Sequence, residues 1–205
     1  MPTMVPAIIL AAGRSSRMGV PKPLLVVAPG GPTFVRALAA TLVAGGAADA
    51  LIVGRPDDAP LIEEVDRIEA ARFVPNVDAD RGQLSSVIAG LAAADRPGTT
   101  AVLVTPVDSP LIKPETVAAV LAAFAAGRAR IVRATYRGRH GHPVLFARAV
   151  FDELRAADPT VGAKAVVRRH AAGTLDLDVD DPAVLDDIDA PGDYERMLAS
   201  GRPLA

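Results

Sequence analysis

The chain has 205 residues, no cysteine and a formal net charge of −2, from 22 basic and 24 acidic side chains. This length suits one domain with a sizeable core, and the near-neutral charge gives no overall attraction to nucleic acid or to a membrane surface. The missing cysteines exclude disulfides, thiolate metal sites and cysteine nucleophiles. The apolar run near the start is far shorter than the ~20 residues of a membrane span, and no basic region precedes it as in a signal peptide, so we expect a cytoplasmic protein.

Short apolar runs alternate with segments of helical periodicity over the first two thirds of the chain. The periodicity predicts strands at residues 5–11, 50–53, 72–75, 100–105 and 129–136, and helices at 33–44, 59–70, 85–94 and 115–126. Residues 76–83 are polar and indicate a loop. The alternation predicts crossover units and a mostly parallel sheet inside a three-layer α/β/α sandwich, whose ligands bind beyond the carboxyl ends of the strands.

The pattern changes after Gly138. We expect a loop over residues 139–143, a short strand at 144–146, helices at 149–156 and 162–170, a strand at 174–179 and a terminal helix at 193–199. The basic cluster Arg168-Arg169-His170 lies late in one of these helices, where positive charge complements the helix dipole without any ligand. This part of the chain is predicted to cover one side of the cleft.

A basic loop follows the first strand. It reads Gly13-Arg14-Ser15-Ser16-Arg17-Met18-Gly19, and Lys22 comes shortly after it between two prolines. Small residues let backbone N–H groups approach a phosphate closely, and the cations neutralise it. The spacing excludes a Walker loop, in which four residues separate the glycines and Lys follows directly, and it lacks the middle glycine of the dinucleotide fingerprint. The loop therefore predicts a phosphate site of another kind.

Two acidic segments are candidates for chemistry. Asp108 follows the buried strand at 100–105 and suits either an Mg²⁺ ligand or a turn before Pro110. Asp187 and Asp189 alternate along an extended segment, so both point to one side. The alternative for this segment is an acidic loop in which Asp193 caps the last helix, while Asp180 and Asp181 are expected to lie in solvent.

Two further segments allow both a structural and a functional interpretation. In Asp80-Arg81-Gly82-Gln83-Leu84-Ser85-Ser86, glycine permits close approach of a ligand, and the serines stand at a helix start, where a capping role is the plain alternative. In Gly141-His142-Pro143, His142 is either a surface residue or a hydrogen-bonding group for a substrate.

The first loop resembles the signature L-A-A-G-x-S-x-R-M-G-x-x-K of the MobA-like nucleotidyltransferases. In this chain the signature runs from Leu10 to Gly19 and on to Lys22, and it matches at every defined position. Three more segments are similar to the family's patterns: V-D-S-P at 107–110, with Val107 where many members have Gly; G-H-P-V-L-F at 141–146; and D-I-D-A-P-G-D-Y at 187–194, with Ala190 and Gly192 where the family has Thr and Glu. The resemblance covers nearly the whole chain, and its motifs come in the family's order.

This resemblance implies a Rossmann-like nucleotidyltransferase fold in a single domain, with a nucleotide-binding half at about residues 1–136 and an acceptor-binding, lid-like part at about 137–205. The implied reaction moves a nucleoside monophosphate to the terminal phosphate of an acceptor such as molybdopterin and releases pyrophosphate. CTP is favoured as the donor, because Ala11-Ala12-Gly13 resembles the cytidylyl type. Mg²⁺ is the implied cofactor, with Mn²⁺ as a substitute, and a molybdoenzyme or its maturation chaperone is the implied partner. The alternatives are a sugar- or polyol-phosphate cytidylyl- or uridylyltransferase and a non-catalytic nucleotide or cofactor carrier.

The resemblance also implies a role for individual residues. Lys22, Arg17 and Asp108 are the implied catalytic residues, and Asp108 and Asp189, with Asp187 as the alternative, are the implied metal ligands. The acceptor would contact His142 and Pro143, although His142 is not expected to be a general base, because a phosphate nucleophile with a second pKa of about 6 is already largely ionised. The implied nucleotide-binding residues are Ala11, Ala12, Gly13, Arg14, Ser15, Ser16, Arg17, Met18, Lys22, Gly82, Ser85 and Ser86.

Overall fold

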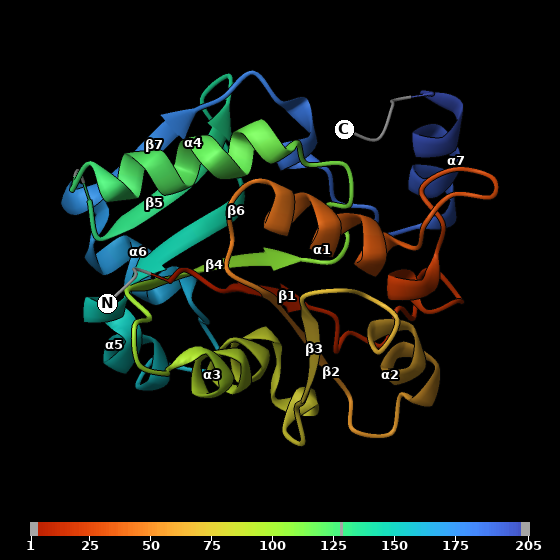
Figure 1. The fold of residues 1–205 in the computed structure, drawn as a ribbon, viewed down its shortest axis with the longest axis horizontal. Coiled ribbons are helices and arrows are strands. Elements are labelled where there is room, and N and C mark those ends of the chain that lie inside the picture. Colours follow the sequence, from red (N-terminus) through yellow and green to blue (C-terminus); the bar gives the residue numbers. More distant parts are fainter. Residues whose placement is uncertain (1–3, 128, 202–205) are drawn as a thin grey trace.

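The computed structural model describes residues 4–127 and 129–201, and these residues form one seven-stranded sheet with the strand order β3-β2-β1-β4-β6-β5-β7 (Figure 1). Strand β6 is antiparallel to both of its neighbours, and every other pair is parallel. The chain order reverses between β1 and β4, which is where open α/β sheets bind their ligands. The strands are β1 (Ala7–Leu10), β2 (Ala50–Gly54), β3 (Ala71–Pro75), β4 (Ala101–Pro106), β5 (Ile131–Tyr136), β6 (Arg139–Ala147) and β7 (Thr174–Asp178).

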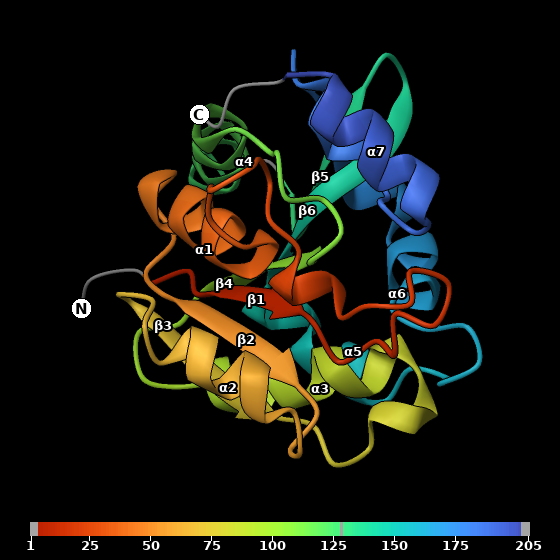
Figure 2. The same ribbon diagram turned by 90° about the vertical axis from the view of Figure 1, so that its right-hand side faces the viewer.

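Helices cover both faces of the sheet (Figures 1 and 2). One hydrophobic cluster joins a sheet face to α1 (Phe34–Ala44), α2 (Ala59–Val65), α4 (Pro114–Ala125) and α7 (Pro191–Ala199). A second cluster joins the other face to α3 (Gln83–Ala94), α5 (Phe151–Arg155) and α6 (Lys164–Arg169). The predicted three-layer sandwich with a mostly parallel sheet is therefore confirmed. Short 3₁₀ helices complete the chain: η1 (Lys22–Leu24), η2 (Ala79–Arg81), η3 (Arg148–Val150), η4 (Ala171–Gly173) and η5 (Pro182–Leu185).

Strand β1 is at the centre of this arrangement. Its side chains alternate between the two clusters, with Ile9 in the first and Ile8 in the second, so the continuous apolar run reflects burial on both faces. Helix α3 approaches β1 closely because residue 90 is glycine: a Cβ atom there would lie 2.5 Å from Cγ2 of Ile8. Thr33 caps α1, since its side chain accepts a hydrogen bond from the backbone N–H of Arg36. Within the described residues, no helix combines the length and apolar character needed to cross a membrane.

The loop predicted at residues 139–143 is wrong, because β6 begins at Arg139. A tight turn at Arg137 and Gly138, both with positive φ, folds β6 back on β5, as the favoured two-residue hairpin turns do. The pairing register shifts between Arg133 and Thr135, opposite the stretch that contains Pro143. Such irregularities accommodate a proline inside a sheet, where it has no N–H to donate. The proline therefore marks a bulge in the pairing, and it does not mark a loop.

His142 is consequently a strand residue, and it is half-buried. Its ring hydrogen-bonds to the backbone carbonyl of Val104, while its Nδ1 atom is buried without a partner. Burial lowers the pKa of His142 from 6.5 to about 4, so the imidazole is neutral at pH 7.

This burial predicts a pH dependence of stability. Between about pH 6.5 and pH 4 the unfolded chain binds a proton at His142 that the folded protein excludes, so the free energy of unfolding falls as the pH is lowered through this window, by roughly 2–3 kcal/mol from this one group. His142→Gln should flatten that part of the curve, whereas His140→Gln, which removes an exposed histidine of the same strand, should retain it. Urea unfolding at a series of pH values measures both, and an unchanged slope in His142→Gln contradicts the assignment.

Asp181 was expected in solvent and is instead buried, with 1% of its surface exposed. Its carboxylate accepts hydrogen bonds from the backbone N–H groups of Lys113 and Ala183 and from the hydroxyl of Thr116. These hydrogen bonds compensate the carboxylate for its burial. Two of the donors lie at the start of α4, where the helix dipole also favours a negative charge. The residue fastens the segment after β7 to α4.

Removing this carboxylate should destabilise the fold. Asp181→Ala leaves three donors unpaired in a buried place, and we expect the free energy of unfolding to fall by roughly 2–4 kcal/mol. Asp180→Ala, at the exposed neighbouring position, should change it by less than about 0.5 kcal/mol. Chemical denaturation of the two variants decides the point, and equal midpoints would refute it.

Candidate functional site

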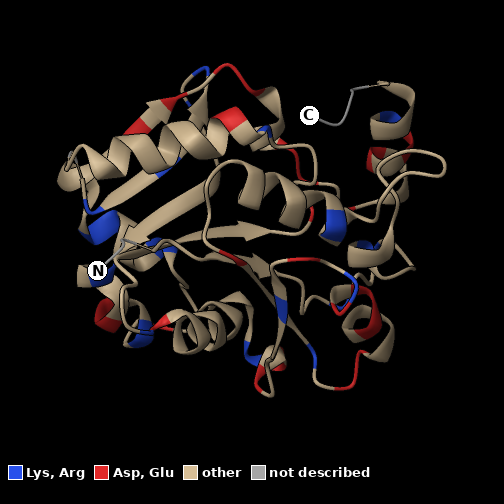
Figure 3. Ribbon diagram, viewed as in Figure 1, with Lys and Arg blue, Asp and Glu red and all other residues tan. Residues whose placement is uncertain are grey.

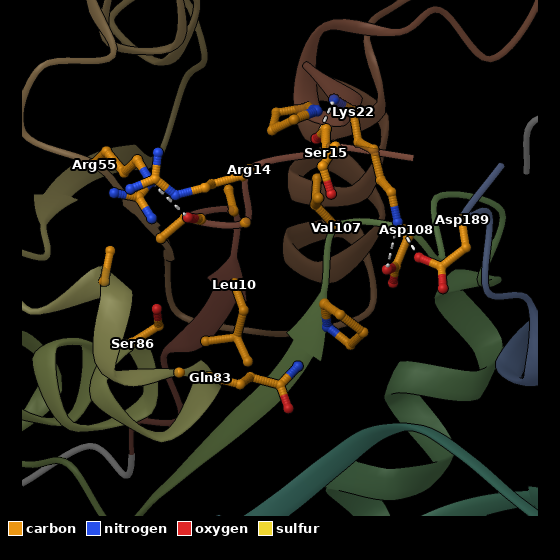
Figure 4. Close-up of a pocket in the computed structure, with 18 of the residues that line it drawn as sticks. Leu10, Arg14, Ser15, Lys22, Arg55, Gln83, Ser86, Val107, Asp108 and Asp189 are labelled. Carbon is orange, nitrogen blue, oxygen red and sulfur yellow. Dashed lines mark hydrogen bonds and ion pairs between the residues drawn. The ribbon is translucent and has the colours of Figure 1, made fainter. Parts of the chain in front are cut away.

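A cleft of about 450 Å³ opens where β1 and β4 end, at the edge that Figure 2 faces. The loop after β1 forms one wall, the segment that leads into α3 forms another, and the end of β4 with the segment before α7 completes it (Figure 4). The lining comprises Leu10, Ala11, Ala12, Gly13, Arg14, Ser15, Ser16, Arg17, Lys22, Pro23, Arg55, Ala79, Asp80, Gly82, Gln83, Ser86, Pro106, Val107, Asp108 and Asp189.

The loop after β1 is held by its own backbone. The carbonyl of Ser15, a residue with a φ of 50°, accepts hydrogen bonds from the N–H groups of Met18 and Gly19. The Ser15 hydroxyl accepts another from the N–H of Lys22, which fixes the start of η1. Met18 is buried in the core and anchors the loop from behind, so its side chain does not line the cleft. A Cβ atom at Gly13 would meet nothing within 4 Å, so glycine leaves open space beside the cleft at that point.

Lys22 reaches across the cleft to two carboxylates. Its Nζ atom lies 3.3 Å from Oδ2 of Asp108 and bonds to Oδ1 of Asp189, which also accepts from Arg17 through its other oxygen. The Lys22 side chain is 12% exposed, so little solvent screens these pairs. Its hydrogen bond to Asp189 holds the pKa of that carboxyl below the usual value.

Asp108, Asp187 and Asp189 form an acidic triad whose carboxylate oxygens lie within 4.8 Å of one another. Burial raises the pKa of Asp108 above its ordinary value, the Lys22 ammonium opposes the rise, and Asp187 adds to it. Asp187 is exposed, whereas Asp108 and Asp189 are partly covered. Three hard oxygen donors at this spacing suit a divalent cation such as Mg²⁺ or Mn²⁺.

The segment after β7 is tied to the end of β4, which is why the triad assembles. The N–H of Ile188 donates to the backbone carbonyl of Asp108, and the Ser109 hydroxyl donates to the carbonyl of Asp186. Asp193 accepts from the N–H groups of Asp189 and Ala190, so it caps the start of α7 as expected, from a position inside the helix.

The far wall carries a second ionic cluster, in which Arg55 is the residue that the sequence analysis did not name. Asp80 accepts three hydrogen bonds from Nε and Nη2 of Arg14 and one from Nη2 of Arg55. These bonds hold the pKa of Asp80 below its ordinary value. Arg55 also donates through Nε to the carbonyl of Ala12 at 3.2 Å, so it links this wall to the loop after β1. The sequence signal that could have identified Arg55 was its position one residue beyond the end of β2, at the same edge of the sheet as Gly13 and Asp108.

The serines at the start of α3 do not cap it. The helix begins at Gln83, two residues earlier than predicted, with Gly82 as its N-cap at φ 95° and ψ 179°, a conformation open essentially to glycine alone. The Asn76 side chain donates to the hydroxyls of both Ser85 and Ser86. Ser86 lines the cleft, whereas Ser85 lines a smaller neighbouring cavity of about 260 Å³.

The cleft thus brings together most of the residues that the resemblance implied for nucleotide and metal binding. Met18, Ser85, His142 and Pro143 do not line it, and Asp187 joins it only through the acidic triad. Of the predicted site residues, those that line the cleft are Ala11, Ala12, Gly13, Arg14, Ser15, Ser16, Arg17, Lys22, Gly82, Ser86, Asp108 and Asp189.

Comparisons with known proteins agree with this arrangement. The sequence profile of the MobA-like NTP transferase domain matches residues 7–174. A molybdenum cofactor guanylyltransferase of Rhizobium meliloti (strain 1021) is 31% identical over an alignment of 184 residues that covers 85% of this chain and 79% of that protein. The crystal structure of Rv0371c from Mycobacterium tuberculosis H37Rv superposes with a TM-score of 0.78 at 27% identity, covering 97% of this chain and 99% of that one. A crystal structure of Rv0371c in complex with manganese gives 0.74 at 24% identity, covering 97% and 100%.

Three findings agree: the cleft lies where the strand order reverses between β1 and β4, the profile matches most of the chain, and a curated relative is 31% identical. The chain belongs to the MobA-like NTP transferase domain family of nucleotidyltransferases.

Proposed function

We propose that this protein transfers a nucleoside monophosphate from a nucleoside triphosphate, CTP in the first instance, to the terminal phosphate of molybdopterin, with release of pyrophosphate. The observation that carries the proposal is the meeting of a cationic loop and an acidic triad in one cleft, joined by Lys22. Phosphoryl and nucleotidyl transfer need anions to be brought together and their charge neutralised, and this is what such a cleft provides. The curated relative, by its name, acts on the molybdenum cofactor, which supports the choice of acceptor.

The residues of the cleft divide the work. Arg17 and the backbone of residues 13–18 would hold the β- and γ-phosphates, and Lys22 would sit near the α-phosphate, where an oxygen of the acceptor's phosphate attacks in line and pyrophosphate leaves. Asp108 and Asp189, with Asp187 beside them, would hold the divalent metal, and their oxygen donors fit Mg²⁺ and Mn²⁺ alike. The manganese complex of Rv0371c supports a divalent cation in this fold. When bound, the metal neutralises phosphate charge.

The second candidate donor is GTP. It is favoured by the relative from Rhizobium meliloti, which is named a guanylyltransferase and is 31% identical. CTP is favoured by Ala11-Ala12-Gly13 in the loop, because this tripeptide resembles that of the cytidylyltransferases. These residues line the cleft together with Gly82 and Ser86, the side on which we place the base and ribose.

The acceptor side is proposed for the part of the chain after residue 136. His142 and Pro143 belong to it by resemblance, although they lie outside the lining of the nucleotide cleft. A sugar or polyol phosphate is the alternative acceptor, and a non-catalytic carrier of nucleotide or cofactor is the alternative outside the enzymes. Retention of Arg17, Lys22, Asp108 and Asp189 in one cleft argues against the carrier.

Calorimetric titration with CTP, GTP, UTP and ATP, each with and without Mg²⁺, tests the donor. We expect metal-dependent binding of CTP that Asp108→Ala weakens at least tenfold, because the carboxylate offers a metal ligand. Asp180→Ala, an exposed carboxylate far along the chain, serves as the matched control. Preference for GTP transfers the proposal to guanylyl transfer, preference for UTP or ATP favours the sugar-phosphate alternative, and absence of binding to all four refutes nucleotidyl transfer.

Lys22→Ala tests the transition-state role of the lysine. We expect kcat to fall by about 10²–10³, because charge builds on the leaving oxygen during the transfer, and we expect nucleotide affinity to fall by less than tenfold. Lys113→Ala removes an exposed lysine and should leave both quantities unchanged. Steady-state kinetics with molybdopterin, combined with titration of the nucleotide, separates the two effects. A loss of nucleotide affinity with kcat unchanged would contradict the transition-state role and assign Lys22 to ground-state binding alone.

A further inference from the structure

All four cations that line the nucleotide cleft are bonded to carboxylates of the same cleft. Arg14 and Arg55 bond to Asp80, and Arg17 and Lys22 bond to Asp189, so each of the four cations has a carboxylate partner. Counting the complete acidic triad, four carboxylates face these four cations. Figure 3 shows acidic and basic segments interspersed over the whole ribbon, and Figure 4 shows the two ionic clusters at opposite ends of the cleft.

A triphosphate that enters the cleft therefore meets little net positive charge, and its phosphates must take cations from the carboxylates that hold them. The bonds differ in strength. Arg14 and Asp80 are each about two-thirds exposed, and Arg17 is 71% exposed, so water screens these pairs and they exchange easily. Lys22, Asp108 and Asp189 are 12%, 19% and 24% exposed, so their attraction is screened much less.

The Lys22 ammonium lies against the carboxylates to which the proposed function assigns a metal ion. It contacts an oxygen of Asp108 and an oxygen of Asp189, two of the three carboxylates that form the triad. A divalent cation binds carboxylate oxygens at about 2.0–2.6 Å. A cation bound to these oxygens would lie close to the Lys22 ammonium, and the two positive charges would repel each other. The ammonium and the metal consequently compete for the same carboxylates.

We propose that Lys22 is the resident counter-ion of the acidic triad, and that it excludes a divalent metal until a nucleoside triphosphate draws its ammonium onto phosphate. This inference rests on the proposed function, because it assigns the triad to metal and the cleft to a nucleotide. Metal and nucleotide then bind with positive coupling: the nucleotide vacates the triad for the metal, and the metal repels Lys22 toward the phosphates. By thermodynamic linkage, each ligand strengthens the binding of the other by the same factor.

The test measures Mn²⁺ binding by electron paramagnetic resonance of the free ion, with α,β-methylene-CTP or α,β-methylene-GTP as a nucleotide that cannot transfer. In the wild-type protein, the nucleotide should strengthen Mn²⁺ binding about tenfold, within the usual range of coupling between two sites. In Lys22→Met, Mn²⁺ should bind about tenfold more tightly than to wild type without nucleotide, and the further gain on adding the nucleotide should be smaller than in wild type. Lys113→Met, which removes an exposed lysine away from the cleft, should behave like wild type.

Mn²⁺ affinity in Lys22→Met that is equal to or weaker than in wild type overturns the proposal, and so does an equal gain in Lys113→Met. Circular dichroism checks that the variant folds; if Lys22→Met does not, Arg17→Gln serves in its place, because it frees Asp189 from one of its two cations and should raise Mn²⁺ affinity a few-fold. A wild-type protein that binds neither nucleotide nor Mn²⁺ refutes the proposed function itself. Binding of both at unchanged affinity in each other's presence refutes only the coupling.

Discussion

The backbone hydrogen bond from Ile188 to Asp108 is the contact on which the candidate site depends. It joins the end of β4 to the segment after β7, and the hydroxyl of Ser109 reinforces it through Asp186. Two carboxylates that are far apart in the chain become neighbours only because of this tie. The antiparallel position of β6 makes the tie short, since β5 and β7 then run in the direction of β4 and end at the same edge of the sheet.

Like charges held so close together need compensation, and the cleft supplies it internally. The raised pKa of Asp108 records the cost of burial, and the lowered pKa of Asp189 records the gain from Lys22 and Arg17. Arg14 and Arg17 are exposed to solvent, which weakens their ion pairs, whereas Lys22 at the triad is largely shielded from it. The cationic and acidic side chains therefore neutralise one another within the cleft.

Apolar runs and glycine-containing loops were enough to predict the sheet, its layers and the loop at residues 13–22, because burial on both faces of a parallel sheet leaves a strong local pattern. Strand β6 was missed in part because a proline inside a strand is tolerated only at an irregularity of pairing, which a partner strand decides. Asp181 and Arg55 were missed for a related reason: their partners, Thr116 and Asp80, are distant in sequence, and composition says nothing of such pairs. The start of α3 depended on the backbone of Gly82, which allowed the helix to begin before the serines.

The position of the acidic triad along the chain has a consequence for synthesis. All seven strands are present once residue 178 has been made, whereas Asp189 and the helix α7 that fixes its backbone come afterwards. The Tyr194 hydroxyl of that helix also donates to the carbonyl of Val26, shortly after Lys22 in the chain. The strands of the described sheet are therefore made before Asp187 and Asp189, and the acidic triad is completed last.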